Sequence, residues 1–133
     1  MNISDYEKYR TLDELLDFVT KKYNCKNRTE AKAQALKLMP KEAKFQAKIM
    51  EYLNSRSDVL AWKDQAGLYQ SKGVPDIIAI KDGLFYGFVV KRPFFGKLSS
   101  IQSSFHDKIR SAGGRVYVVS LVSEVRNILD TGR

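Results

Sequence analysis

The stretch GVPDIIAIKDGLFYGFVVKRPFFGKLSSIQSSF, residues 73–105, decides the fold expected for this chain. An apolar run over residues 74–80 predicts a strand, and a second apolar run over 84–91 predicts the strand that returns beside it. Between them, Asp82-Gly83 is a typical two-residue hairpin turn. The stretch therefore predicts an antiparallel hairpin, then a loop, and then a helix that Ser99 begins as the N-cap.

The open end of this hairpin brings an acid and a base together. Asp76 stands at the head of the first strand, and Lys91 stands at the end of the second. A carboxylate at this place can hold a hard divalent cation, and a lysine can orient a water or stabilise a pentavalent phosphate. The layout is typical of phosphodiesterases. On spacing alone, an ordinary turn-flanking Asp and a sheet-end Lys are the simpler interpretation.

Hydrophobic periodicity predicts the elements on both sides of the hairpin. Helices are expected over residues 5–23 and 28–39 and from Pro40 onward, a strand over 58–65, a helix after Ser99, a strand over 115–120 and a last helix over 122–129. From residue 41 the order is α-β-β-β-α-β-α. This order predicts an α/β fold with a mixed central sheet flanked by helices, plus additional N-terminal helices.

The charge of the chain suggests a polyanionic partner. Its 133 residues contain 23 Lys and Arg against 15 Asp and Glu, which gives a formal net charge of +8 with the single His neutral. The surplus gathers between Lys91 and Arg115, where six basic residues face only Asp107. Nucleic acid is the commonest partner of such a surplus, and a solvated basic face is the alternative.

Composition also excludes several classes of protein. The single cysteine, Cys25, forms no intrachain disulfide and no Cys-rich zinc site, so an intracellular, cytoplasmic setting is expected. The apolar runs are all shorter than the ~18 residues that span a bilayer. The N-terminus MNISDYEKYR is polar and mixed in charge, unlike a signal peptide. We therefore expect no membrane partner.

The deciding stretch resembles the VRR-NUC branch of the PD-(D/E)xK nuclease superfamily. That branch follows the approximate pattern G-x-P-D, a short hairpin, a strand ending E-x-K, a basic loop, and S-x-x-Q opening a helix. The residues that match are Gly73, Pro75, Asp76, Lys91, Ser99 and Gln102. Upstream, Glu42 followed by Gln46 resembles the leading helical glutamate of the family, and residues 113–119 resemble its next core strand.

The resemblance covers roughly residues 41–125, so we expect a nuclease domain over 41–133 and a helical extension over 1–40. It implies a restriction-endonuclease-like core of order α-β-β-β-α-β. It also implies Mg²⁺ or Mn²⁺ as the cofactor, hydrolysis of phosphodiesters in branched, junction or duplex DNA, and a homodimer.

The resemblance also assigns roles to individual residues. Asp76 would bind the metal together with Glu42 and the backbone carbonyl of Val90. Lys91 would stabilise the transition state, and Gln102 would shape the site near that lysine.

One position departs from the family pattern. The acid of E-x-K falls at residue 89, and this chain has Val89 there. Because side chains alternate along a strand, Val89 and Lys91 point to the same face, so a valine takes the place of the second metal-binding carboxylate. Asp64 is one candidate substitute, but it is not a compelling one. Hard cations need several oxygen ligands, so metal affinity should fall.

Other residues near the hairpin suit nucleic acid or the core. Candidate DNA contacts are Lys72, Arg92, Lys97, Arg110 and Tyr69. Gln102, His106 and Arg110 are spaced by four and share one helix face, where His106 is expected to be a surface or packing residue. Trp62, Phe88 and Phe105 are expected in the core, whereas Phe94-Phe95 in a loop invites a partner.

Two classes of function therefore compete. The first is a metal-dependent DNA endonuclease, selective for branched or junction DNA, with its activity in question at Val89. The second is a catalytically inactive nuclease-fold protein that binds nucleic acid or acts as a protein-interaction or inhibitor module.

Overall fold

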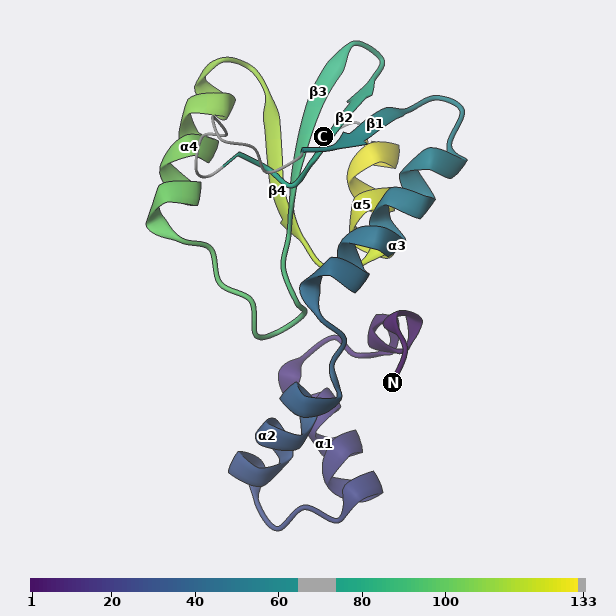
Figure 1. The fold of residues 1–133 in the computed structure, drawn as a ribbon, viewed down its shortest axis with the longest axis vertical. Coiled ribbons are helices and arrows are strands. Elements are labelled where there is room, and N and C mark those ends of the chain that lie inside the picture. Colours follow the sequence, from purple (N-terminus) through teal and green to yellow (C-terminus); the bar gives the residue numbers. More distant parts are fainter. Residues whose placement is uncertain (65–73, 132–133) are drawn as a thin grey trace. The chain divides into compact units, whose positions relative to one another are not determined.

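The structure is a computed structural model that describes residues 1–64 and 74–131 (Figure 1). The chain divides into two compact units, Met1–Lys41 and Glu42–Arg133. Within the described ranges, the helices are too short or too polar to cross a membrane. Three residues named from the sequence, Tyr69, Lys72 and Gly73, lie outside the described residues.

The first unit is built from short helices. They are the 3-10 helix η1 (Ile3–Lys8), α1 (Leu12–Tyr23) and α2 (Arg28–Leu38). The expectation of one helix over residues 5–23 is wrong, because the backbone is extended at Tyr9. The Thr11 hydroxyl accepts a hydrogen bond from the Glu14 N–H at 3.2 Å and begins a new helix there.

The second unit is organised around one mixed sheet. Its strands are β1 (Leu60–Lys63), β2 (Ile77–Lys81), β3 (Leu84–Val90) and β4 (Arg115–Val119), in the order β1-β2-β3-β4. β2 pairs antiparallel with both β1 and β3, whereas β4 pairs parallel with β3. The Asp82-Gly83 turn is where the sequence predicts it, with φ of 55° and 76°.

Three helices cover this sheet: α3 (Glu42–Ser55), α4 (Ser100–Ser111) and α5 (Val122–Thr131). Figure 1 shows α3 and α5 together on one side of the sheet and α4 on the other. The Arg56 guanidinium, just after α3, donates hydrogen bonds to Asp58 and to Asp130 of α5, each at 2.8 Å. The order α-β-β-β-α-β-α and the α/β fold expected from the sequence are confirmed.

The sheet therefore has two faces that carry different side chains. The α3/α5 face carries Ile77, Ala79, Tyr86, Phe88 and Val90, and the α4 face carries Ile78, Ile80, Phe85, Gly87 and Val89. Contacts at Gly114 identify the second face. A Cβ built on Gly114 would lie 2.6 Å from Cγ2 of Ile109 in α4 and 3.2 Å from Cδ1 of Phe85.

The α3/α5 face holds the main core. All five of its side chains are at most 1% exposed, and those of Phe45, Ile49 and Leu53 on α3 are fully buried. The Phe88 ring stacks on Tyr86 and Tyr117, with 6.3 Å between ring centroids in each pair. The expectation that Phe88 lies in the core is confirmed.

The α4 face is covered less completely. α4 packs against β4, whereas β1 is the strand at the opposite edge of the sheet. Trp62 on β1 is 43% exposed, so the expectation that it lies in the core is wrong. The physical reason is this distance from α4: a helix that covers one edge of a sheet leaves the other edge open.

Candidate functional site

Asp76 lies at the entrance to β2, where the chain bends. Its Oδ2 accepts a hydrogen bond from the backbone N–H of Val90 at 2.8 Å. Its own carbonyl accepts a hydrogen bond from the N–H of Asp64 at 2.9 Å. The carboxylate therefore closes the end of the β2–β3 ladder, because it takes the place of a backbone acceptor. One of its two oxygens is committed to this structural bond.

The residue before Asp76 explains why the chain bends at this point. Pro75 folds over Gly87 of β3, and a Cβ at position 87 would lie only 2.7 Å from Cγ of Pro75. Glycine is required for this close approach. The contact fixes the start of β2 on β3 and holds Asp76 beside Val90.

Lys91 lies at the other branch of the hairpin, directly after β3. Its N–H donates a hydrogen bond to the carbonyl of Val119 at 2.9 Å. The following loop turns back on it, because the Gly96 N–H donates to the Arg92 carbonyl at 3.1 Å. A Cβ on Gly96 would lie 2.5 Å from Cβ of Lys91. The loop thus packs on the stem of Lys91, which is half-buried.

Val89, in β3 two residues before Lys91, is fully buried. The register of β2 and β3 ends at the pair of Ile77 with Phe88, and Val89 is the next residue of β3 beyond that pair. Val89 is 0% exposed and shares the α4 face with Lys91. The place of the second carboxylate in the family pattern is therefore an apolar position in the packed interior.

The metal ligands expected from the sequence are Asp76, Glu42 and the backbone carbonyl of Val90, a set with two carboxylates. Within residues 1–64 and 74–131, His, Cys, Asp and Glu side chains form no group of three that could hold a metal ion. The remaining residues, 65–73 and 132–133, contain none of these four residue types. Glu42 is the first residue of α3, and its role as a metal ligand beside Asp76 stays a prediction.

His106 is the unexpected member of the site. It is 0% exposed, and neither ring nitrogen has a hydrogen-bond partner in the part of the chain that the structure describes. Burial lowers its pKa, and Arg110 and Lys91 act in the same direction, whereas Asp107 and Asp76 oppose them. The ring is therefore neutral at pH 7. It sits within electrostatic range of both Asp76 and Lys91.

Comparison with known proteins finds solved structures with a similar fold. Neither protein-family models nor curated proteins give a match. Among solved structures, a "VRR_NUC domain" is 23% identical with a TM-score of 0.56, over 67% of this chain and 94% of that one. A "VRR_NUC domain protein" is 13% identical with a TM-score of 0.57, over 69% and 87% of the two chains.

The chain has the VRR-NUC fold. At these identities the likeness shows the fold, and the α-β-β-β-α-β core expected from the sequence is confirmed.

Gln102 has a structural role in this VRR-NUC fold. Its Oε1 accepts hydrogen bonds from the N–H and the hydroxyl of Ser99 at 3.1 and 3.2 Å, while the Ser99 hydroxyl accepts from the Gln102 N–H at 3.2 Å. This is a capping box, which satisfies backbone donors at the start of a helix. The S-x-x-Q pattern thus begins α4, the helix that carries His106.

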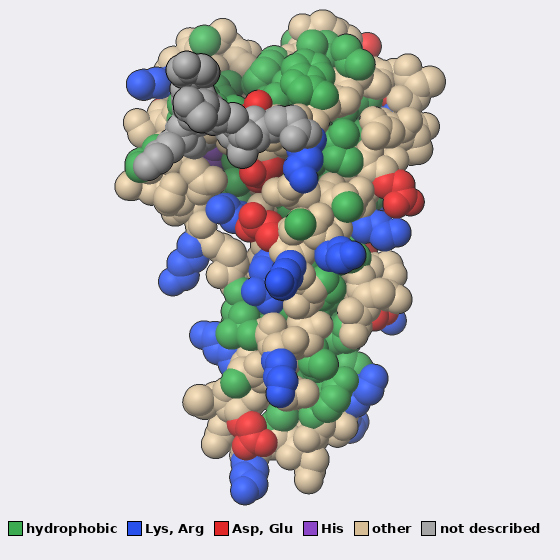
Figure 2. Space-filling model, viewed as in Figure 1, with side chains coloured by type: hydrophobic (Ala, Val, Ile, Leu, Met, Phe, Trp, Pro, Cys, Tyr) green, Lys and Arg blue, Asp and Glu red, His purple; other side chains and the backbone are tan. Residues whose placement is uncertain are grey.

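The residues of this chain that were predicted to contact DNA differ in exposure and in hydrogen bonding. Arg110 donates to the carbonyl of Val116 at 2.9 Å, so its guanidinium braces α4 against β4. Arg92 is half-buried and Lys97 is exposed. Figure 2 shows Lys and Arg side chains dispersed over the face in view, with Asp and Glu among them. Tyr69 and Lys72 lie outside the described residues.

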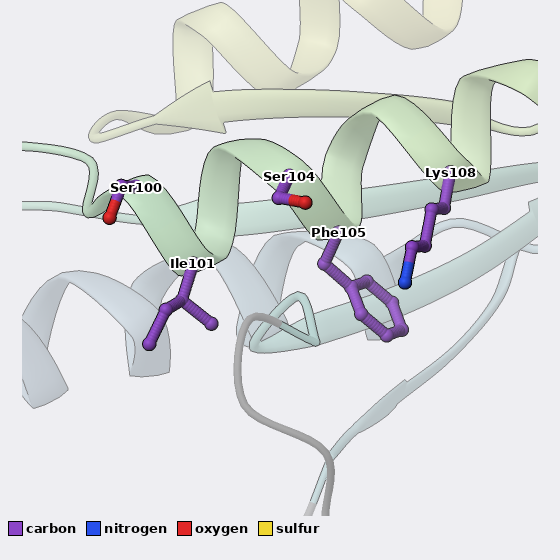
Figure 3. Close-up of a pocket in the computed structure, with 5 residues that line it drawn as sticks. All are labelled: Ser100, Ile101, Ser104, Phe105 and Lys108. Atoms are coloured by element: carbon purple, nitrogen blue, oxygen red, sulfur yellow. The ribbon is translucent and has the colours of Figure 1, made fainter.

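Phe105 also differs from expectation, because it is half-buried rather than a core residue. With Ser100, Ile101, Ser104 and Lys108 it lines a shallow hollow of about 270 Å³ along α4. Figure 3 shows that the labelled side chains all come from this one helix. Ile101 on the same helix is 52% exposed, so this side of α4 stays largely open.

Proposed function

We propose that the VRR-NUC fold of this chain binds the phosphate backbone of DNA without cutting it. The observation that carries the proposal is the buried Val89. Lys91 and its basic neighbours remain, but an apolar side chain fills the place of the acid, and the described residues hold no three-ligand metal group. Val89 removes one of the oxygen ligands that a hydrolytic metal site would use, whereas backbone binding needs only positive charge.

The charge distribution supports DNA as the partner. The net charge is +8, and six of the bases lie between Lys91 and Arg115. The loop after β3 packs on Lys91 through Gly96, and it carries Arg92 at its start and the exposed Lys97 just after it. Phosphate contacts of this kind give affinity and register without sequence preference.

A cleavage assay tests the inactive half of the proposal. The chain and its Val89→Glu variant are incubated with four-way, flap and linear DNA in Mg²⁺ and in Mn²⁺. We expect the chain to bind and leave every substrate intact. Cutting by Val89→Glu alone would identify position 89 as the cause of inactivity. Cutting by the unaltered chain would overturn the proposal.

A salt titration tests the binding half. The logarithm of the binding constant falls with the logarithm of salt concentration by about 0.9 for each phosphate contacted. We expect Lys97→Ala to weaken binding to all sequences and to reduce this slope by about 1. Lys48→Ala on α3, an exposed lysine in the helix layer away from the α4 face, is the matched control and should leave the slope unchanged. Affinity that does not respond to salt would favour a protein partner.

Hydrolysis of branched or junction DNA is the rival function, and the likeness to VRR-NUC structures is what motivates it. It requires Asp76 to bind a metal through its second oxygen, since Oδ2 already accepts from Val90. Assembly as a homodimer stays a prediction, which sedimentation of the whole chain tests.

A further inference from the structure

An exposed apolar cluster lies on the sheet edge away from α4. Leu60 is 65% exposed, Trp62 is 43% exposed and Ile80 is 37% exposed. Leu60 pairs directly with Ile80, and Trp62 pairs with Ile78. Directly opposed residues point to the same face, so Leu60, Trp62 and Ile80 form one continuous surface on the α4 face. We call these three residues the β1 patch.

The β1 patch leads directly to the candidate site. Trp62 and Asp64 are two residues apart and therefore point to the same side of the chain. The hydrogen bond from the Asp64 N–H to the Asp76 carbonyl, 2.9 Å long, continues the pairing of β1 with β2 up to Asp76. Two residues of strand span about 6.6 Å, so Trp62 stands roughly that far along the strand from Asp64, the residue that is hydrogen-bonded to Asp76.

We infer that the β1 patch is a stacking platform for unpaired nucleobases, with the Trp62 indole as its centre. The inference rests on the proposed function, because the strand whose bases stack there is the one whose phosphates approach Lys91. An aromatic ring stacks on any base, since every base has a π-face, and Leu60 and Ile80 supply apolar surface on which the base edges rest.

The size of the β1 patch argues against a second copy of the chain as its occupant. A whole aromatic side chain exposes about 150–250 Å², so three partly exposed side chains offer on the order of 300 Å². A stable protein interface takes about 800 Å² from each partner. One or two bases fit the smaller area, and the charge of +8 draws a polyanion rather than another copy of the same cation.

The chain offers a direct probe, because Trp62 is its only tryptophan. Its intrinsic fluorescence is followed while a single-stranded oligonucleotide is added, and the experiment is repeated with a blunt duplex of the same sequence. We expect quenching by the single strand and little change with the duplex, whose bases are already stacked. Equal quenching by both would overturn the inference, because burial by any bound DNA would explain it.

Two variants and one altered ligand complete the test. Trp62→Ala should weaken single-strand binding about tenfold while duplex binding stays within twofold, and Trp62→Phe should retain most of the affinity. An oligonucleotide with abasic sites keeps the phosphates but lacks the bases. The unaltered chain should therefore bind it about as weakly as Trp62→Ala binds the intact strand. Because Trp62 is partly exposed, circular dichroism of both variants should match that of the unaltered chain.

The outcomes separate this inference from the proposed function. If abasic and intact strands bind equally and Trp62→Ala changes neither, the platform does not exist, and salt-dependent duplex binding still supports the proposed function. If neither DNA form binds, both fail. If sedimentation shows a dimer that Trp62→Ala dissociates, the occupant is a second copy and the inference is overturned.

Discussion

The two faces of the sheet differ in the side chains that surround neighbouring residues of β3. On the α3/α5 face, Phe88 and Val90 are fully buried, and the Phe88 ring stacks on Tyr86 and Tyr117. On the α4 face, Val89 is equally buried, but His106, whose ring nitrogens have no hydrogen-bond partner among the described residues, lies within electrostatic range of Asp76 and Lys91. The α3/α5 face is therefore a well-packed apolar core. The α4 face contains buried polar groups that the stability of the fold does not require.

This difference makes the α4 face the better candidate for a functional surface. A buried imidazole without a hydrogen-bond partner costs stability, and native proteins retain such groups mainly where they serve another purpose. An exposed tryptophan at the edge of the same face is a further departure from good packing. Both departures fall on the α4 face. If the proposed function is correct, one face of the sheet serves stability and the other serves binding, so substitutions on the two faces should behave differently.

The largest effect is expected from Phe88→Ala on the α3/α5 face. Removing a buried ring that stacks on Tyr86 and Tyr117 leaves a cavity and should lower the free energy of unfolding by about 3–5 kcal/mol. Trp62→Ala on the α4 face should cost less, about 2 kcal/mol, because the indole is already partly in water. Urea denaturation of both variants measures the difference. Equal losses would mean that the two faces are not distinct.

The next effect compares adjacent strand positions. Val90→Glu places a carboxylate in the apolar core and should lower the free energy of unfolding by more than about 3 kcal/mol. Val89→Glu places it near His106 and Lys91, where it finds hydrogen-bond donors, and should cost about half as much. Both native valines are 0% exposed, so each variant is the control for the other. Urea denaturation measures both, and a greater loss in Val89→Glu would contradict a polar interior on the α4 face.

A smaller effect is expected at the start of α4. Gln102→Ala removes the capping box with Ser99 and should lower the free energy of unfolding by about 1 kcal/mol. Ser103→Ala, one position along the same helix, should change it by less than about 0.5 kcal/mol. Thermal denaturation measures both. If Gln102→Ala leaves stability unchanged but abolishes DNA binding, the side chain acts in the site rather than in the cap.

The smallest effect is a dependence on pH. Because the pKa of His106 is lowered on folding, mainly by burial, the unfolded chain binds more protons than the folded one below the ordinary value of 6.5. Stability should therefore be complete above pH 6.5 and fall as the pH drops below it. Urea denaturation at pH 8 and pH 5.5 measures the loss, which should shrink in His106→Asn. An unchanged loss in that variant would assign it to other groups.

Much of the fold was predictable from local signals. Asp82-Gly83 between two apolar runs specifies the hairpin, and the period of the helices is plain in residues such as Phe45 and Ile49. The break before α1 was also signalled, since Thr11 followed by Glu14 is a capping pattern that the longer apolar period concealed.

The burial and exposure of residues on the α4 face were less predictable. Residues 59–62 are all apolar, so alternation does not show that β1 lies at an edge with Trp62 exposed. The spacing of Gln102, His106 and Arg110 predicts a shared polar face. Whether a sheet buries that face depends on the crossover from β3 to β4, which involves residues far apart in the sequence.

The Asp82-Gly83 turn has a consequence for the order of folding. A two-residue turn with positive φ at both positions closes a hairpin in about 1–10 μs, whereas the parallel β3–β4 pair must wait for the whole of α4 to cross the sheet. Asp76 and Lys91 are therefore brought together before the helix that covers them arrives. A disturbed turn should slow folding, while a disturbed α4 should chiefly speed unfolding.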